Sequence, residues 1–189
     1  MIKWLPIIIV STLLFSCKSK KSTDEPVDIF PALQFIKSQV AHVDTSVYRI
    51  IKIVKTDSLI DTSYINRERF KAEAKDFLSI PDIASGDLKD DYVETKLYDK
   101  DLDQVSLSYM PKGKAEITRQ EVLIKSSADG DKVTSIYINR TTSAGGTTTQ
   151  KIMFWQIDKS FRIVTITGHN KEPEKTVTVD VVWNGFQAT

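Results

Sequence analysis

Carboxylates alternate along the chain at Asp99, Asp101 and Asp103, a spacing that could bind a metal ion or supply acids for hydrolysis. A calcium-binding EF-hand loop needs glycine at its sixth position and an acid at its twelfth, and a glutamine and a methionine stand there. The aspartates therefore fit a solvated hairpin turn better than a metal site. With Glu94 they supply the carboxylate pairs that a glycoside hydrolase would need.

Other residue types used in catalysis are scarce. His42 and His169 are the only histidines, and neither stands in a recognisable motif. No serine lies in a Gly-x-Ser-x-Gly nucleophile elbow. Gly145 and Gly146 are not followed by the lysine of a phosphate-binding loop. We therefore expect a protein without catalytic activity or a cofactor, and a carboxylate-based hydrolase of envelope carbohydrate is the alternative.

The single cysteine, Cys17, suggests chemistry of a different kind. It follows an apolar run from Trp4 to Phe15, which is preceded by the basic Lys3 and separated from the cysteine by the small Ser16. This is the layout of a secretory signal peptide. The run of about a dozen residues is shorter than the roughly 20 needed to cross a membrane. We expect the segment to be removed by cleavage.

Leu14, Ser16 and Cys17 resemble the lipobox of bacterial lipoproteins, although Phe15 departs from the small residue common at its position. The resemblance implies cleavage after residue 16 and acylation of Cys17, which would anchor the protein because each buried methylene contributes about 0.8 kcal/mol. With this lipobox, a Tyr/Ile-rich predicted hairpin, a predicted helix that ends near Pro81 and a last strand that closes on Val-Val-Trp at residues 181–183, the whole chain resembles small lipoproteins of Bacteroidota, and this likeness implies no activity. No aspartate, the signal for inner-membrane retention, follows Cys17 directly, so the resemblance implies an outer-membrane anchor. Surface-exported lipoproteins of Bacteroidota carry acids close after the cysteine, whereas here Lys18, Lys20 and Lys21 precede Asp24 and Glu25, so the resemblance implies that the protein faces the periplasm.

The charge balance argues against a nucleic-acid binder. The chain holds 26 basic and 25 acidic residues, and removal of residues 1–16 takes away Lys3 alone, which leaves 25 of each. Nucleic-acid binders carry a basic excess that neutralises phosphates. Residues 17–28 are polar and lack an apolar period, so we expect a flexible tether after the lipidated cysteine. Residues 29–186 are long enough for one domain held together without disulfides.

Hydrophobic periodicity predicts the elements that would position these groups. Residues 31–43 fit an amphipathic helix, residues 47–54 and 59–65 fit a strand hairpin, and residues 66–81 fit a second helix capped by Asn66. From Tyr92 onward apolar and polar residues alternate, which predicts about seven antiparallel strands. The order favours an α+β fold in which two helices pack on one face of a curved, mostly antiparallel meander sheet that resembles a half-open barrel. The predicted strands after Tyr92 include residues 104–109, 116–125, 132–140, 151–157, 161–167 and 176–183.

Aromatic residues in the C-terminal strands are the remaining candidates for a site. Phe154 and Trp155 are adjacent, so their rings are expected on opposite faces of the sheet. Both faces of the strand at 151–157 are apolar, which predicts cover on both sides. Ordinary core packing is the simpler interpretation, and a groove formed by Tyr137, Phe154, Trp155 and Trp183 is the functional one. The sequence thus predicts a lipid-anchored, non-enzymatic envelope protein that binds a lipid, another apolar ligand or an envelope protein.

Overall fold

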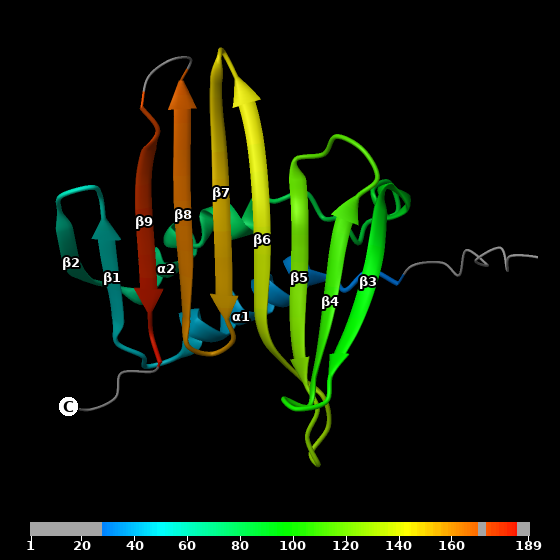
Figure 1. Cartoon of the computed structure of the whole chain (residues 1–189). Coiled ribbons are helices and arrows are strands. Elements are labelled where there is room, and N and C mark those ends of the chain that lie inside the picture. Colours follow the sequence, from blue (N-terminus) through cyan, green and yellow to red (C-terminus); the bar gives the residue numbers. More distant parts are fainter. Residues whose placement is uncertain (1–27, 170–172, 185–189) are drawn as a thin grey trace, which may run out of the picture.

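The computed structural model describes residues 28–169 and 173–184, and these residues form three α-helices and one nine-stranded sheet (Figure 1). Cys17, the signal peptide and the expected tether up to residue 27 lie outside the described residues. The helices are α1 (Ala32–Thr45), α2 (Arg67–Glu73), α3 (Lys75–Leu78) and the short 3-10 helix η1 (Lys89–Asp91). The strands are β1 (Ile50–Lys55), β2 (Ile60–Ile65), β3 (Tyr92–Asp99), β4 (Gln104–Pro111), β5 (Ile117–Lys125), β6 (Lys132–Ala144), β7 (Thr147–Gln156), β8 (Ser160–His169) and β9 (Lys175–Val182).

The sheet is antiparallel throughout, in the order β2-β1-β9-β8-β7-β6-β5-β4-β3. The seven strands β3 to β9 form the predicted meander, because each pairs with its neighbour in sequence. The hairpin β1–β2 was also predicted, but its position in the sheet was not. It extends the sheet beyond β9, because β1 pairs with β9. Since β2 and β3 are edge strands, the sheet does not close. The predicted α+β fold with a curved meander sheet is confirmed.

Strands β6 and β7 are longer than the sequence pattern predicted. The first strand was expected to end at Arg140 and the second to begin at Lys151. The threonine and serine residues between these positions instead extend both strands, which pair in register up to Ala144 and Thr147. Gly145 and Gly146 both have positive φ, 58° and 78°, which suits a two-residue hairpin turn. The polar run lacks hydrophobic alternation but keeps the β-branched side chains that favour strands, which explains the difference.

Helix α1 confirms the first predicted helix and buries Leu33, Ile36 and Val40. The second predicted helix is wrong as a single element. It is divided at Ala74, which has a non-helical ψ of 4°, and Asn66 makes no side-chain capping hydrogen bond. Ala74 is fully buried, so its small side chain lets both short helices approach the sheet closely.

An aromatic cluster forms the centre of the core between the helices and the sheet. Phe70 of α2 and Phe77 of α3 lie edge-on to Trp155 of β7, with ring centroids 6.3 and 5.1 Å away. Phe161 of β8 stacks on Trp155 at 5.3 Å, and Trp183 lies 5.5 Å from the same ring. All five side chains are buried, which fixes the helices on one face of the sheet.

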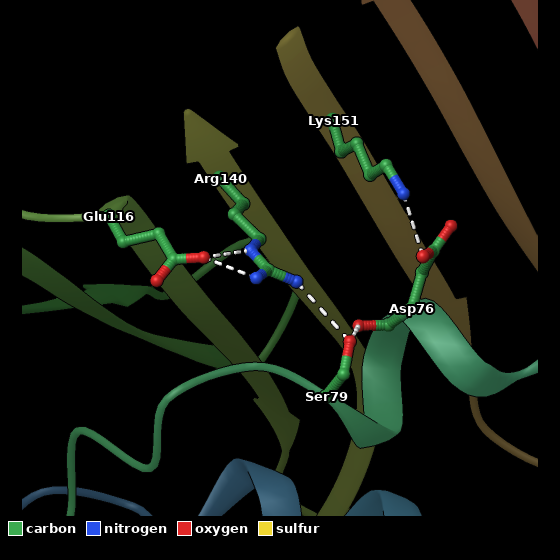
Figure 2. Close-up of polar contacts among 5 residues, drawn as sticks. All are labelled: Asp76, Ser79, Glu116, Arg140 and Lys151. Carbon is green, nitrogen blue, oxygen red and sulfur yellow. Dashed lines mark hydrogen bonds and ion pairs between the residues drawn. The ribbon is translucent and has the colours of Figure 1, made fainter. Parts of the chain in front are cut away.

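Polar contacts fix α3 to the same face (Figure 2). The ammonium of Lys151 on β7 donates to Asp76 of α3 at 2.7 Å. Arg140 on β6 pairs with Glu116 and also donates to the hydroxyl of Ser79 at 3.3 Å, just after α3. The ion pairs occupy the border of the core, where the polar strand ends emerge from under the helices, and we assign them a structural role.

Candidate functional site

The three α-helices cover one face of the sheet and leave the other face uncovered by any described element (Figure 1). We call the uncovered side the open face. Cross-strand partners define one continuous row of side chains across it, which we call the central row. From β2 to β3 the central row is Thr62, Ile53, Asp180, Arg162, Phe154, Tyr137, Glu121, Ser108 and Thr95.

The middle of the central row is apolar. Phe154 is 38% exposed, and its direct cross-strand neighbour on β6 is Tyr137. Ile152 and Val164 pair beside them and are half-buried. The expectation that this strand is covered on both sides is wrong for the described part of the chain, since no described element covers Phe154. An aromatic and aliphatic centre is therefore presented to the surroundings.

Charged side chains flank this centre toward β1. Arg162 pairs with Asp180 at 2.5 Å, and Lys55 lies 3.5 Å from the other carboxylate oxygen. Asp180 is only 7% exposed, while both cations reach solvent. With Phe154 these residues line a surface cavity of about 380 Å³, so an apolar ring and two cations border the same hollow.

A second ion pair flanks the centre toward β4. Arg119 contacts Glu121 at 2.5 Å, and Ser106 donates a hydrogen bond to the same carboxylate at 3.0 Å. The guanidinium of Arg119 also lies over the ring of Tyr137, 5.8 Å from its centroid. The aromatic centre is thus bordered on both sides by arginine–carboxylate pairs.

The structure does not bring the four predicted aromatic residues together. Tyr137 and Phe154 lie on the open face, whereas Trp155 and Trp183 are buried under the helices. Residue alternation explains the division, because neighbours in a strand point to opposite faces. The two tryptophans have the ordinary core role that was the simpler interpretation.

The acidic residues proposed for hydrolysis are spread out. Asp99 ends β3, and Asp101 and Asp103 follow in the β3–β4 turn, where the Asp99 carboxylate accepts from the backbone N–H groups of Asp101 and Leu102. Glu94 is five residues before Asp99 on β3, roughly 17 Å away at ~3.3 Å per residue. Glycosidase carboxylates are about 5–9.5 Å apart. The Asp99 carboxylate therefore stabilises the turn, and Glu94 is too distant to pair with the aspartates there.

Glu94 instead accepts a hydrogen bond from the hydroxyl of Tyr109 at 3.0 Å, and that hydroxyl accepts from the backbone N–H of Phe30. Tyr109 is fully buried, and this burial raises the pKa of its phenol well above the usual value of 10. The contact joins the segment before α1 to the β3–β4 edge.

Stability should therefore fall at high pH. The unfolded phenol ionises near pH 10 while Tyr109 in the folded protein stays neutral, so its stabilisation is present below pH 10 and is lost as the pH rises toward the folded pKa. We expect Tyr109→Phe to make the decline shallower by up to about 1.4 kcal/mol per pH unit. Urea unfolding at pH 9, 10 and 11 measures this slope. Equal slopes for the two proteins would contradict the role given to Tyr109.

The histidines do not form a shared site. His42 is exposed on α1, with its ring 6.3 Å from that of Tyr48. His169 is exposed at the end of β8, where its Nδ1 lies 2.7 Å from the hydroxyl of Thr147. In residues 28–169 and 173–184 no group of three histidine, cysteine or acidic side chains could hold a metal ion. None of the described helices is long and apolar enough to cross a membrane.

The flanking ion pairs of the open face were not predicted from the sequence. Arg162 and Asp180 are 18 residues apart, and no local motif relates them. Only the register of β8 with β9 makes them neighbours.

Comparison with known proteins gave no match to a family model, to a curated protein or to a solved structure.

Proposed function

We propose that this chain is a lipid-anchored cell-envelope protein that acts as a non-enzymatic binding module, and that the open face binds another envelope protein. One observation carries the proposal: the aromatic centre at Phe154 and Tyr137 lies uncovered between two arginine–carboxylate pairs. Protein interfaces combine an apolar centre, enriched in aromatic residues and arginine, with a polar rim.

A protein partner fits the open face better than a lipid does. Small-ligand sites bury most of the ligand in a largely apolar pocket. The cavity beside Phe154 is bordered by the charged Lys55, Arg162 and Asp180, and it opens on the sheet surface. An extended surface of this kind matches a partner that supplies both apolar contacts and hydrogen-bond acceptors for the two cations.

The anchor part of the proposal is supported by the lipobox-like residues that end at Cys17. Acyl chains there would hold the domain at a membrane, within reach of other envelope proteins. Cys17→Ser in the full chain should move the protein from the membrane fraction to the soluble fraction. Retention in the membrane fraction would contradict the anchor and leave the open-face proposal standing.

Photo-crosslinking in living cells tests the open face directly. The full chain would carry p-benzoyl-phenylalanine in place of Phe154, and the matched control would carry it in place of Phe35, which lies half-buried on α1. We expect irradiation to give a discrete protein adduct from position 154 and not from position 35. Mass spectrometry then identifies the attached molecule.

A mutation distinguishes specific binding from chance contact. With the crosslinker at position 137, Phe154→Ala should reduce the adduct at least tenfold, because truncation of a central aromatic residue typically costs more than about 1.4 kcal/mol of binding. If the adduct contains a lipid, the open face binds an apolar ligand and not a protein. Equal yields from positions 154 and 35, or no adduct at all, would overturn binding at the open face.

A further inference from the structure

The edge strand β3 exposes several large apolar side chains, although edge strands are usually protected against pairing with other chains. Val93 is 49% exposed, Leu97 66% and Tyr98 51%. Met110 of β4, the direct partner of Val93, is also exposed, as is Leu102 in the adjoining turn. Five of the ten large hydrophobic side chains exposed in the described residues therefore gather at this edge.

The sequence of β3 is self-complementary about its centre. From Tyr92 to Tyr98 it reads aromatic, aliphatic, acid, threonine, base, aliphatic, aromatic, with Thr95 in the middle. We propose that β3 pairs antiparallel with β3 of a second copy, with a two-fold axis at Thr95, so that two sheets join into one. This inference is independent of the function proposed for the open face.

The two-fold axis keeps each side chain on its own face of the joined sheet. Residues whose numbers sum to 190 are opposite each other, so Val93 meets Leu97 of the second copy and Thr95 meets its own equivalent. Both members of each such pair have odd or both have even numbers, and therefore share a face. The helices of both copies then cover the same side, and the two open faces are continuous.

Among the residues that the structure describes, β3 pairs only with β4, so its other backbone edge is unpaired there. The carbonyl oxygen of Asp91 accepts from the N–H of Lys112, so odd-numbered residues direct their backbone groups toward β4. Even-numbered residues consequently direct theirs outward. Glu94 and Lys96 would form hydrogen-bonded pairs with the second copy, and Thr95 would form a non-hydrogen-bonded pair, in which opposite Cα atoms lie about 4.5 Å apart.

The charges select this register. Glu94 meets Lys96 of the second copy, and the two-fold axis makes this contact twice. The Tyr109 hydroxyl already fixes the Glu94 carboxylate at 3.0 Å, while Lys96 has no ion pair among the described residues. Opposite charges directly across antiparallel strands stabilise pairing, whereas like charges oppose it.

The other edge lacks this match. Strand β2 has six residues against eight in β3, and its single charged residue, Asp61, would face Ser63 in a two-fold pairing centred on Thr62.

The dimer through β3 should be weak. A pair of eight-residue edge strands buries less than the roughly 1,600 Å² of a standard interface, so we expect a reversible, concentration-dependent dimer. Covalent trapping is therefore the appropriate first test.

A single cysteine on the two-fold axis tests the register. In the full chain, Thr95→Cys places two thiols on opposed residues at a separation that a disulfide bridges. Mild oxidation should convert most of this variant into a covalent dimer on a non-reducing gel. The matched control is Thr62→Cys, at the centre of the other exposed edge, which should stay monomeric. The unsubstituted chain, oxidised in the same way, shows whether any crosslink forms through Cys17.

Charge reversal tests the pairing without a covalent bond. Glu94→Lys and Lys96→Glu should each reduce dimer formation at least tenfold in analytical ultracentrifugation of the full chain in detergent. Mixing the two single variants should restore a dimer, because every charged pair is then complementary. The double variant Glu94→Lys/Lys96→Glu should also dimerise. Thermal unfolding confirms that each variant is folded before the comparison.

Three outcomes would overturn the proposal. The first is equal crosslinking of the variants at Thr95 and Thr62, or none from Thr95. The second is a monomer at every concentration of the unsubstituted chain. The third is a mixture of the single charge variants that stays monomeric although both are folded.

Discussion

Replacing Phe161 with alanine is expected to lower the free energy of unfolding by about 3–5 kcal/mol. Phe161 is fully buried on the helix-covered face of β8, where its ring contacts aromatic side chains from both short helices, from β7 and from the residue just after β9. Removal of the ring leaves a cavity that the surrounding rings can fill only in part. The neighbouring rings are those of Phe70, Phe77, Trp155 and Trp183, with centroids 5.3 to 6.2 Å away.

Phe154→Ala is the matched control for this prediction. Phe154 lies on the adjacent strand β7 but points to the open face and is partly exposed, so its removal should cost about 1 kcal/mol. Urea unfolding of both variants, followed by far-UV circular dichroism, measures the difference. Similar losses for the two phenylalanines would contradict the exposure of Phe154 on the open face.

Replacing Arg162 with methionine is expected to cost about 2 kcal/mol of stability, because it removes the closest cation from a carboxylate that is almost inaccessible to water. The Asp180 side chain is 11% exposed, and Lys55, at 3.5 Å, is then its remaining charged partner. Methionine keeps the aliphatic cover over Asp180, so the loss of stability measures the contribution of the charge and the hydrogen bond of Arg162.

The opposite substitution should cost less. Asp180→Asn leaves Arg162 and Lys55, which are 56% and 45% exposed, and water can solvate both cations. Chemical unfolding of the two single variants and the double variant gives the coupling between the residues. Equal costs for the two single substitutions would contradict the asymmetric burial of the pair.

The fold was largely predictable because alternation of apolar and polar residues is a local signal. Most of the strand segments between Tyr92 and Trp183 keep that alternation, and the predicted meander follows from it. The strand ends at Ala144 and Thr147 were missed because threonine and serine carry no hydrophobic signal. The break at Ala74 was missed because the buried residues Phe70, Ala74 and Phe77 keep helical spacing across it.

The candidate site was predictable only in part. Sequence alternation correctly directed Phe154 and Trp155 to opposite faces, but it could not say which face the helices cover. That choice depends on how Phe70 and Phe77 pack onto β7 and β8. The ion pair between Arg162 and Asp180 requires the register of two strands, which no residue spacing in the sequence specifies.

The burial of Trp155 and Trp183 has an optical consequence. Both indoles are enclosed by apolar rings, and their Nε1 atoms have no hydrogen-bond partner among the described residues. Their fluorescence should be shifted to the blue and shielded from dissolved quenchers such as iodide. Because both lie on the side of the sheet opposite Phe154, emission and quenching would report the detachment of the short helices and remain silent when a molecule occupies the open face.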